Sequence, residues 1–336
     1  MTPDHVIIAV DGGNSKTDIA VLGDDGCVLA TARGPGSSPH HLGLDGALAV
    51  VESLIDAAWA QAGLGSRDGH EAAVGAIFMA GADLQEEERV LTDAIRARRW
   101  AARVHVANDV FAVLWAGTGS GMGVAVTVGA GINCAGRAPG GRRAWFPALG
   151  AITGDWGGGP DIGMAALGAA VRAEDGRGPA TALAARVAGY FGLSSALDVA
   201  IAIHQGRLDP GRLIELPSLV VELAEAGDGE AMAILNRQAD EVIALATSAI
   251  HQIGVASAAV DVVLGGSILT GSGEMVLSRI RRGVQHVAPE ARVSLCPTRP
   301  VVGAALAGLQ MMGGDDTARD RVREALGRDG ASLLRP

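Results

Sequence analysis

The chain has 336 residues, enough for two ordinary domains, and its 49% hydrophobic and 19% charged composition is that of a globular protein. A formal net charge of −10 with only 3% aromatic residues argues against nucleic-acid binding, which needs a cationic surface and stacking side chains. The three cysteines are scattered and form no C-x-x-C pair, so we expect free thiols and a cytoplasmic protein.

Residues 1–117 predict three strands and then alternating helices and strands. Apolar runs over 6–10, 17–22 and 27–32 are joined by tight glycine turns, which is typical of an antiparallel meander. Apolar side chains at helical or strand spacing then predict, in order, a helix over 44–64, a strand over 73–79, a helix over 86–99, a strand over 104–107 and a helix over 110–116.

The same order begins again after residue 118. Strands over 123–128, 132–136 and 143–146 form a second meander, a helical insertion follows from 157 to about 212, and a long amphipathic helix covers 230–252. The remaining pattern predicts a strand over 260–264, a helix over 274–284, a strand over 293–295 and a helix over 301–312. Two copies of one strand–helix order predict a duplicated α/β architecture with a ligand-binding cleft between two lobes.

These elements suggest domain limits. We expect an N-terminal lobe over 1–117, a C-terminal lobe over 118–300, a closing helix over 301–312 and a peripheral tail over 313–336. The charge-free stretch over 110–136 contains too many glycines for a membrane-spanning helix, so no membrane association is expected.

The turn after the first strand has the composition of an anion-binding site. Its glycines allow consecutive backbone N–H groups to approach phosphate oxygens, and Asp11 at the strand end could hold Mg²⁺ through water. An ordinary glycine hairpin is the alternative, and the segment is not a P-loop because no helix follows it. The residues of this first phosphate turn are Gly12, Gly13, Asn14, Ser15, Lys16 and Thr17.

Two further glycine turns occupy comparable places in the second half. Gly129, Ala130 and Gly131 lie between strands at the position that corresponds to the first phosphate turn, and Asn133 adds a polar side chain to this hairpin. The other turn follows the strand over 260–264 and precedes a helix, where the base and ribose of a nucleotide could lie against the backbone. Its residues are Gly265, Gly266 and Ser267.

Two carboxylates follow strands or glycine bends. Asn108 and Asp109 come at the end of a strand, where α/β proteins place their chemistry, although a helix cap is the alternative. Asp155 follows Gly154 in a bend before a helix, and a cap is again the alternative. The adjacent histidines 40 and 41 show no metal-ligand spacing, so we expect no zinc site.

In this order the motifs resemble those of the BadF/BadG/BcrA/BcrD-type ATPase family, and specifically its N-acetylglucosamine kinase branch. The resemblance covers residues 6–309 and rests on the two phosphate turns, on 107–109, on 263–267 and on 301–305. It implies duplicated actin-like, ribonuclease H-like domains of the actin/hexokinase/Hsp70 superfold, with ATP and Mg²⁺ as cofactors. It also implies an amino sugar as the substrate and a homodimer.

The resemblance assigns roles to individual residues. Asp109 would be the general base for the 6-hydroxyl of N-acetylglucosamine, and the loop over 34–38 would line its acetamido group. Three positions depart from the family pattern: Ala130 replaces a common Thr, Ser38 replaces an Asn of the animal enzymes, and Trp156 replaces a usual Glu. The implied sugar-binding residues are Ser38, Asn108, Asp109, Asn133, Gly154 and Asp155.

Other functions remain open at this point. The substrate could be glucosamine, N-acetylmuramate or glucose. Dehydratase activators of the same family share an Fe–S cluster and need clustered cysteines, whereas the three here are scattered. Sugar-sensing repressors carry an N-terminal helix-turn-helix, whereas here the first strand begins near residue 6.

Overall fold

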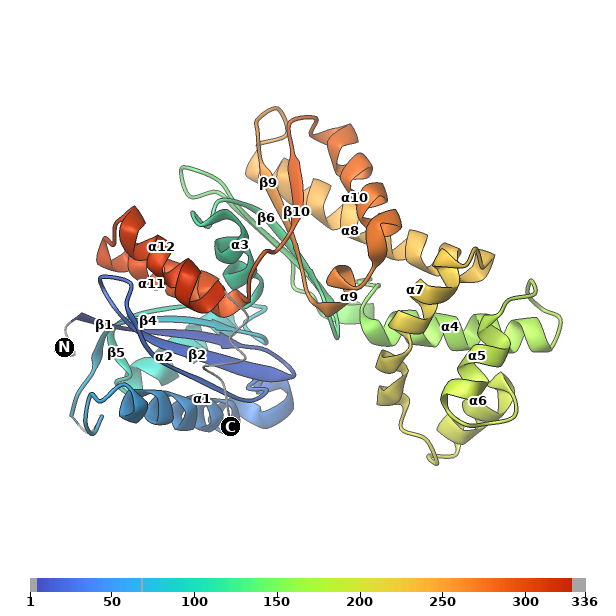
Figure 1. The fold of residues 1–336 in the computed structure, drawn as a ribbon, viewed down its shortest axis with the longest axis horizontal. Helices are drawn as coiled ribbons and strands as arrows, with labels where there is room; N and C mark the ends of the chain where they lie inside the picture. Colours follow the sequence, from blue (N-terminus) through green and yellow to red (C-terminus); the bar gives the residue numbers. More distant parts are fainter. Residues whose placement is uncertain (1–4, 68, 328–336) are drawn as a thin grey trace. The chain divides into compact units, whose positions relative to one another are not determined.

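The computed structural model describes residues 5–67 and 69–327 and contains two five-stranded mixed sheets (Figure 1). The strand order is β3-β2-β1-β4-β5 in the first sheet and, read in the same sense, β8-β7-β6-β9-β10 in the second. The two orders are equivalent, which confirms the duplicated architecture. The strands are β1 Val6–Gly12, β2 Lys16–Gly23, β3 Val28–Pro35, β4 Ala72–Met79, β5 Ala101–Asn108, β6 Gly123–Val128, β7 Ile132–Arg137, β8 Arg143–Trp145, β9 Asp261–Gly265 and β10 Arg292–Leu295.

The chain forms two compact units that do not coincide with the halves of the sequence. Unit 1 holds the described residues up to Ala125, then Ala135–Pro147, and the described residues from Cys296 onward. Unit 2 holds Val126–Cys134 and Ala148–Leu295. The segment that follows β10 therefore belongs to the same unit as the first sheet, although it is far from the strands of that sheet in the sequence.

The central strand β1 of the first sheet is buried on both faces, which is why its first five residues are all apolar. Val6, Ile8 and Val10 belong to one core cluster with residues of α1 (Pro39–Gln61) and α2 (Gln85–Ala97). Ile7 points the other way, toward α11 (Pro300–Met312), where a Cβ on Gly308 would lie 2.5 Å from its Cγ2 atom. A strand with helices on both faces has no need of alternating polar residues.

Helix α1 begins five residues before the predicted start. Pro39 occupies its first turn, where the missing N–H costs nothing, and Ser38 is its N-cap residue. Gly43, with φ of 68°, interrupts the helix and separates this first turn from the amphipathic part that the spacing predicted. The buried side chains of that part include Leu48, Val51 and Ile55.

Helices α3 (Val110–Thr118) and α11 cross closely, because a Cβ on Gly303 would lie 1.9 Å from the carbonyl oxygen of Ala112. We expected a peripheral tail from residue 313, but its described part forms α12 (Asp316–Gly327). Three apolar residues, Ala318, Val322 and Leu326, recur every four positions and are buried. Because the segment is highly charged, this apolar stripe was not recognised from the sequence.

Unit 2 is mainly helical. Its helices are α4 Gly159–Glu174, α5 Leu183–Tyr190, α6 Ala196–His204, α7 Pro217–Glu225, α8 Gly229–Ile253, α9 Ser267–Thr270 and α10 Gly273–Val287, with short 3₁₀ helices at Gly150–Ile152 and Pro210–Glu215. The helical insertion thus runs beyond residue 212 to include α7. Among the described residues, no helix is both long enough and apolar enough to span a bilayer.

Candidate active site

The carboxyl ends of three parallel strands meet at one edge of the first sheet. In the strand register Gly12 lies beside Met79, and Met79 lies beside Asn108. The turns that leave this edge carry the first phosphate turn, residues 80–84, and Asp109. The first and the third of these segments were predicted from the sequence as site segments, and both lie at this edge.

The first phosphate turn exposes its tip. The Gly13 N–H donates to the Lys16 carbonyl oxygen over 2.9 Å, which closes the hairpin. Asn14, Ser15 and Lys16 are exposed, so their polar groups are accessible to a ligand. Thr17 is different: it is fully buried, and its hydroxyl donates to the Ser37 Oγ atom over 2.8 Å.

The loop over residues 34–38 packs directly on the first phosphate turn. A Cβ on Gly36 would lie 2.1 Å from the Asn14 carbonyl oxygen, and the Ser37 N–H donates to the Gly13 carbonyl oxygen over 3.1 Å. A Cβ on Gly12 would lie 2.6 Å from Ser37 Oγ. Internal packing alone therefore accounts for glycine at position 12, whatever this turn binds.

Two carboxyl groups at this edge have strongly raised pKa values. Burial, followed by the charges of Asp109 and Asp18, raises the pKa of Asp11 to about 8. Burial and then the charge of Asp83 raise the pKa of Asp109 to about 7. Lys16 and Arg33 oppose the shift at Asp11, but Arg33 is already paired with Asp18 through two hydrogen bonds of 2.6 and 2.8 Å. The edge is thus an electronegative site that a cation or a proton would stabilise.

The Asn108 side chain caps α3, whereas the Asp109 side chain does not. The Asn108 Oδ1 atom accepts the Val110 N–H over 2.9 Å. Asp109 occupies the N-cap position but makes no side-chain cap bond. The alternative of a helix cap therefore applies to Asn108 alone, and the Asp109 carboxylate remains available for chemistry.

Asp83 supports Asn108 and was missed by sequence analysis. It is 8% exposed, and its Oδ1 atom accepts a hydrogen bond of 2.6 Å from Asn108 Nδ2. Burial raises the pKa of Asp83 to about 6, although nearby His40 opposes the shift. Asp83 lies in the turn after β4, which ends at Met79, whereas Asp109 follows β5 directly, so the rule that selected Asp109 finds Asp83 only when it is applied to the whole turn.

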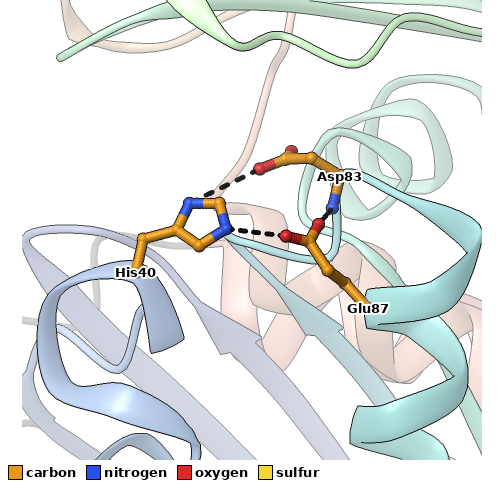
Figure 2. Close-up of side chains that lie close together, drawn as sticks. All are labelled: His40, Asp83 and Glu87. Carbon is orange, nitrogen blue, oxygen red and sulfur yellow. Dashed lines mark hydrogen bonds and ion pairs between the residues drawn. The ribbon is translucent and has the colours of Figure 1, made fainter.

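Ser38 and His40 lie at the start of α1, beside Asp83. Ser38 is 1% exposed, and its Oγ atom neither caps α1 nor has any hydrogen-bond partner among the described residues. His40 lies between the carboxylates of Asp83 and Glu87 (Figure 2). No local spacing could reveal this group, because its carboxylates lie more than 40 residues further along the chain.

In unit 2 the second phosphate turn rests on the glycine bend over 157–159. The Gly159 N–H donates to the Gly129 carbonyl oxygen over 2.8 Å, and a Cβ on Gly158 would lie 2.6 Å from the Ala130 carbonyl oxygen. Asp161, another residue that sequence analysis missed, fixes the bend by accepting two backbone N–H groups. A Cβ on Gly131 or on Gly129 would meet no atom within 4 Å.

The turn predicted to contact the base and ribose of a nucleotide, residues 265–267, packs on the end of β6. We call it the adenosine turn. Gly266 has a φ of 90°, and a Cβ there would lie 2.2 Å from the Val128 carbonyl oxygen, so only glycine fits. Gly266 and Ser267 are exposed, whereas Gly265 is buried at the end of β9. The turn therefore lies close to the second phosphate turn, which begins directly after Val128.

The sugar-binding residues predicted in unit 2 lie near these turns. Asp155 is half-buried, and its carboxylate accepts the hydroxyl hydrogen of Thr153. Asn133 is also half-buried, and its Oδ1 atom accepts the Cys134 N–H over 2.7 Å. Beside Asp155, the Trp156 ring stacks under the Arg237 guanidinium at 3.9 Å, which gives the unusual Trp a partner.

Comparison with known proteins identifies the family. The sequence profile of the BadF/BadG/BcrA/BcrD ATPase family matches residues 8–308. The chain belongs to this family. The match includes both phosphate turns, Asp109 and the adenosine turn.

Relatives of this BadF-family chain include sugar kinases. It is 28% identical over 266 residues to an N-acetylmuramic acid/N-acetylglucosamine kinase of Clostridium acetobutylicum, covering 78% of this chain and 85% of that protein. It is 24% identical over 317 residues to an N-acetyl-D-glucosamine kinase of Dictyostelium discoideum, covering 91% and 98%.

Solved structures share the fold. A Chromobacterium violaceum protein proposed to be an N-acetylglucosamine kinase gives a TM-score of 0.70 at 24% identity, covering 91% of this chain and 99% of that one. A ROK family glucokinase of Streptomyces griseus, solved with glucose and AMPPNP, gives a TM-score of 0.52 at 18% identity over the same shares. These likenesses confirm the predicted actin-like fold class.

The cysteines of this BadF-family chain are separate free thiols. Cys27 is exposed, Cys296 is half-buried, and burial raises the pKa of the Cys134 thiol far above its usual range. Within residues 5–67 and 69–327, the single group of side chains spaced to hold a metal contains no cysteine. That group is His40, Asp83 and Glu87.

Proposed function

We propose that this protein is an ATP-dependent kinase that transfers a phosphoryl group to the 6-hydroxyl of N-acetylglucosamine. The observation that carries the proposal is Asp109. This carboxylate ends a central strand, does not cap the following helix, and has a pKa raised to about 7. A base with this pKa can accept a proton near neutral pH. The named kinases among the relatives support the sugar and the reaction.

In the proposed reaction the sugar 6-oxygen attacks the γ-phosphorus of ATP. The bond from that phosphorus to the β–γ bridging oxygen breaks, ADP leaves, and the hydroxyl proton passes to Asp109. Asn108, whose side chain caps α3 and donates to Asp83, would hold the segment that carries Asp109 in place. Because phosphoryl transfer has a loose transition state, most of the acceleration would come from positioning and electrostatics.

The predicted turns and polar residues would each bind one part of ATP or of the sugar. The exposed tip of the first phosphate turn and the second phosphate turn would hold the β- and γ-phosphates through backbone N–H groups, with Lys16 as a point charge. The adenosine turn would contact the base and ribose through Gly266 and Ser267. The sugar would contact Ser38, whose buried hydroxyl lacks a partner, together with Asn133, Gly154 and Asp155.

The residues around Asp11 fit a magnesium ion. Asp11 is 8% exposed beside two further carboxyl groups, and oxygen ligands with excess negative charge are what Mg²⁺ prefers. Asp11 would hold the ion through water, and the bound ion would neutralise phosphate charge. The two positive charges of Lys16 and Arg33 do not offset the three carboxyl groups of Asp11, Asp18 and Asp109.

An ADP-release assay over a panel of sugars tests the proposal. We expect N-acetylglucosamine to give the highest kcat/KM, with N-acetylmuramate, glucosamine and glucose included as alternatives. ADP release that no sugar stimulates would reject the kinase function, whereas preference for another sugar would reject only the substrate.

We also propose a homodimeric, cytoplasmic enzyme, on the family resemblance and the free thiols. Light scattering on the eluting protein would test the dimer, because the proposal requires twice the chain mass. A monomeric mass at micromolar concentration would reject it.

A further inference from the structure

The His40 side chain lies between two carboxylates that belong to another part of unit 1 (Figure 2). Its Nε2 atom is 3.0 Å from Glu87 Oε1, and its Nδ1 atom is 3.9 Å from Asp83 Oδ2. His40 comes from the first turn of α1, whereas Asp83 and Glu87 come from the β4–α2 turn and the start of α2. We call His40, Asp83 and Glu87 the His40 clamp.

Both carboxylates of the clamp are fixed by other bonds. The Glu87 Oε2 atom accepts the backbone N–H groups of Asp83 and Leu84 over 2.9 and 2.8 Å, which caps α2 and leaves Oε1 toward His40. The Asp83 Oδ1 atom accepts Asn108 Nδ2 over 2.6 Å. A continuous polar chain therefore runs from the start of α1, through the β4–α2 turn, to the residue before Asp109.

The two contacts of His40 within this group differ in length. The two ring nitrogens face different carboxylates, so the ring bridges the start of α1 to both of them. The contact with Glu87 is a hydrogen bond of 3.0 Å, whereas the Asp83 Oδ2 atom, at 3.9 Å from Nδ1, lies beyond hydrogen-bond distance. Among the described residues, the ionisable groups that face His40 are two acids, Asp83 and Glu87.

We propose that His40 is a positioning residue for the sugar, acting by tying the loop over 34–38 to the turn that supports Asn108 and Asp109. The inference rests on the proposed kinase function. His40 lies two residues after Ser38, whose buried hydroxyl has no partner among the described residues. Holding this loop against the Asp83 turn fixes the distance between the sugar-contacting groups and the base.

The clamp is separate from the hydrophobic core, so its loss should leave the fold intact. The His40 side chain is 46% exposed, whereas the buried side chains of α1 begin at Ala47. His41, the next residue, is exposed, and no side-chain partner is described for it. His41→Ala is therefore a matched control for His40→Ala.

Three substitutions at position 40 separate the two arms of the clamp, which are the contact of His40 with Glu87 and its contact with Asp83. His40→Ala removes both arms. His40→Gln can place an amide nitrogen near the Nε2 position and keep the bond to Glu87, and His40→Asn can place one near the Nδ1 position toward Asp83. We expect His40→Ala to raise KM for the sugar roughly ten- to a hundredfold, with KM for ATP unchanged, because misplaced binding groups cost about that much. His40→Gln should recover most of the loss, and His41→Ala should match the wild type.

Amide hydrogen exchange followed by mass spectrometry tests the clamp without relying on catalysis. His40→Ala should speed exchange in peptides covering residues 83–88 and 108–112, and His41→Ala should not. If the wild type phosphorylates a sugar and His40→Ala keeps its KM, or raises both KM values equally, the positioning role is wrong. Unchanged exchange in both segments would refute the clamp even if the kinase function itself failed.

Discussion

Gly131→Val places a side chain on the second phosphate turn at a point where the protein itself leaves room. A Cβ at Gly131 meets no atom within 4 Å, and the residue does not have a left-handed φ. The substitution should therefore change the free energy of unfolding by no more than about 0.5 kcal/mol, as is usual for an exposed site. An ATP phosphate held by this turn would collide with the new side chain.

The expected loss in ATP binding is large by comparison. A hydrogen bond to a charged group contributes about 1.5–3 kcal/mol, so losing one should weaken ATP binding roughly 10- to 150-fold, and losing two should weaken it further. Calorimetric titrations of Mg·ATP and, separately, of sugar measure this, with thermal unfolding as the stability control. Sugar binding should be nearly unchanged.

Two outcomes would refute the reasoning about the second phosphate turn. Wild-type ATP affinity in Gly131→Val would exclude the turn from phosphate binding, and equal losses for ATP and sugar would indicate a general distortion. Gly12→Val cannot replace this test at the first phosphate turn, because its Cβ would lie 2.6 Å from Ser37 Oγ and so disturb the fold itself.

Three further predictions concern the base and the substrate. Asp109→Asn should keep the melting temperature within a few degrees but lower kcat about 10²- to 10⁴-fold, and a variant with half the wild-type kcat would exclude Asp109 as the base. Because Asp109 must be ionised to accept a proton and its pKa is raised to about 7, kcat/KM should fall as pH drops through about 7; a profile flat to pH 5 would contradict this. Glucose and glucosamine should show kcat/KM values roughly ten- to a hundredfold below N-acetylglucosamine, because groups that bind the acetamide would be left unpaired; equal values would reject the substrate.

Much of the fold follows from local sequence patterns. The apolar run over 6–10 predicted the first strand, and the glycine turn after Asp11 predicted the hairpin that places this carboxylate at the sheet edge. The repeat of the strand order predicted the second sheet. Asp109 was predicted as a site residue because it follows the end of a strand, where α/β proteins place their chemistry.

The features that were missed depend on contacts between distant residues. The tail from residue 313 was expected to be peripheral, but Leu326 is buried in α12, where the many charged residues mask the apolar stripe in the sequence. His40 gains its meaning only from Asp83 and Glu87, which lie on other elements. The reason for glycine at position 36 is also tertiary, because the Asn14 carbonyl oxygen occupies the space of its Cβ.

The position of the transferred phosphate decides whether the protein phosphorylates the sugar 6-hydroxyl. Wild-type protein is incubated with Mg·ATP and N-acetylglucosamine, and the product is examined by ¹H–³¹P correlation NMR. We expect a single sugar phosphate whose phosphorus couples to the two C6 protons, and no such product from Asp109→Asn. Phosphate on another carbon, or ATP hydrolysis with the sugar unmodified, would contradict this expectation.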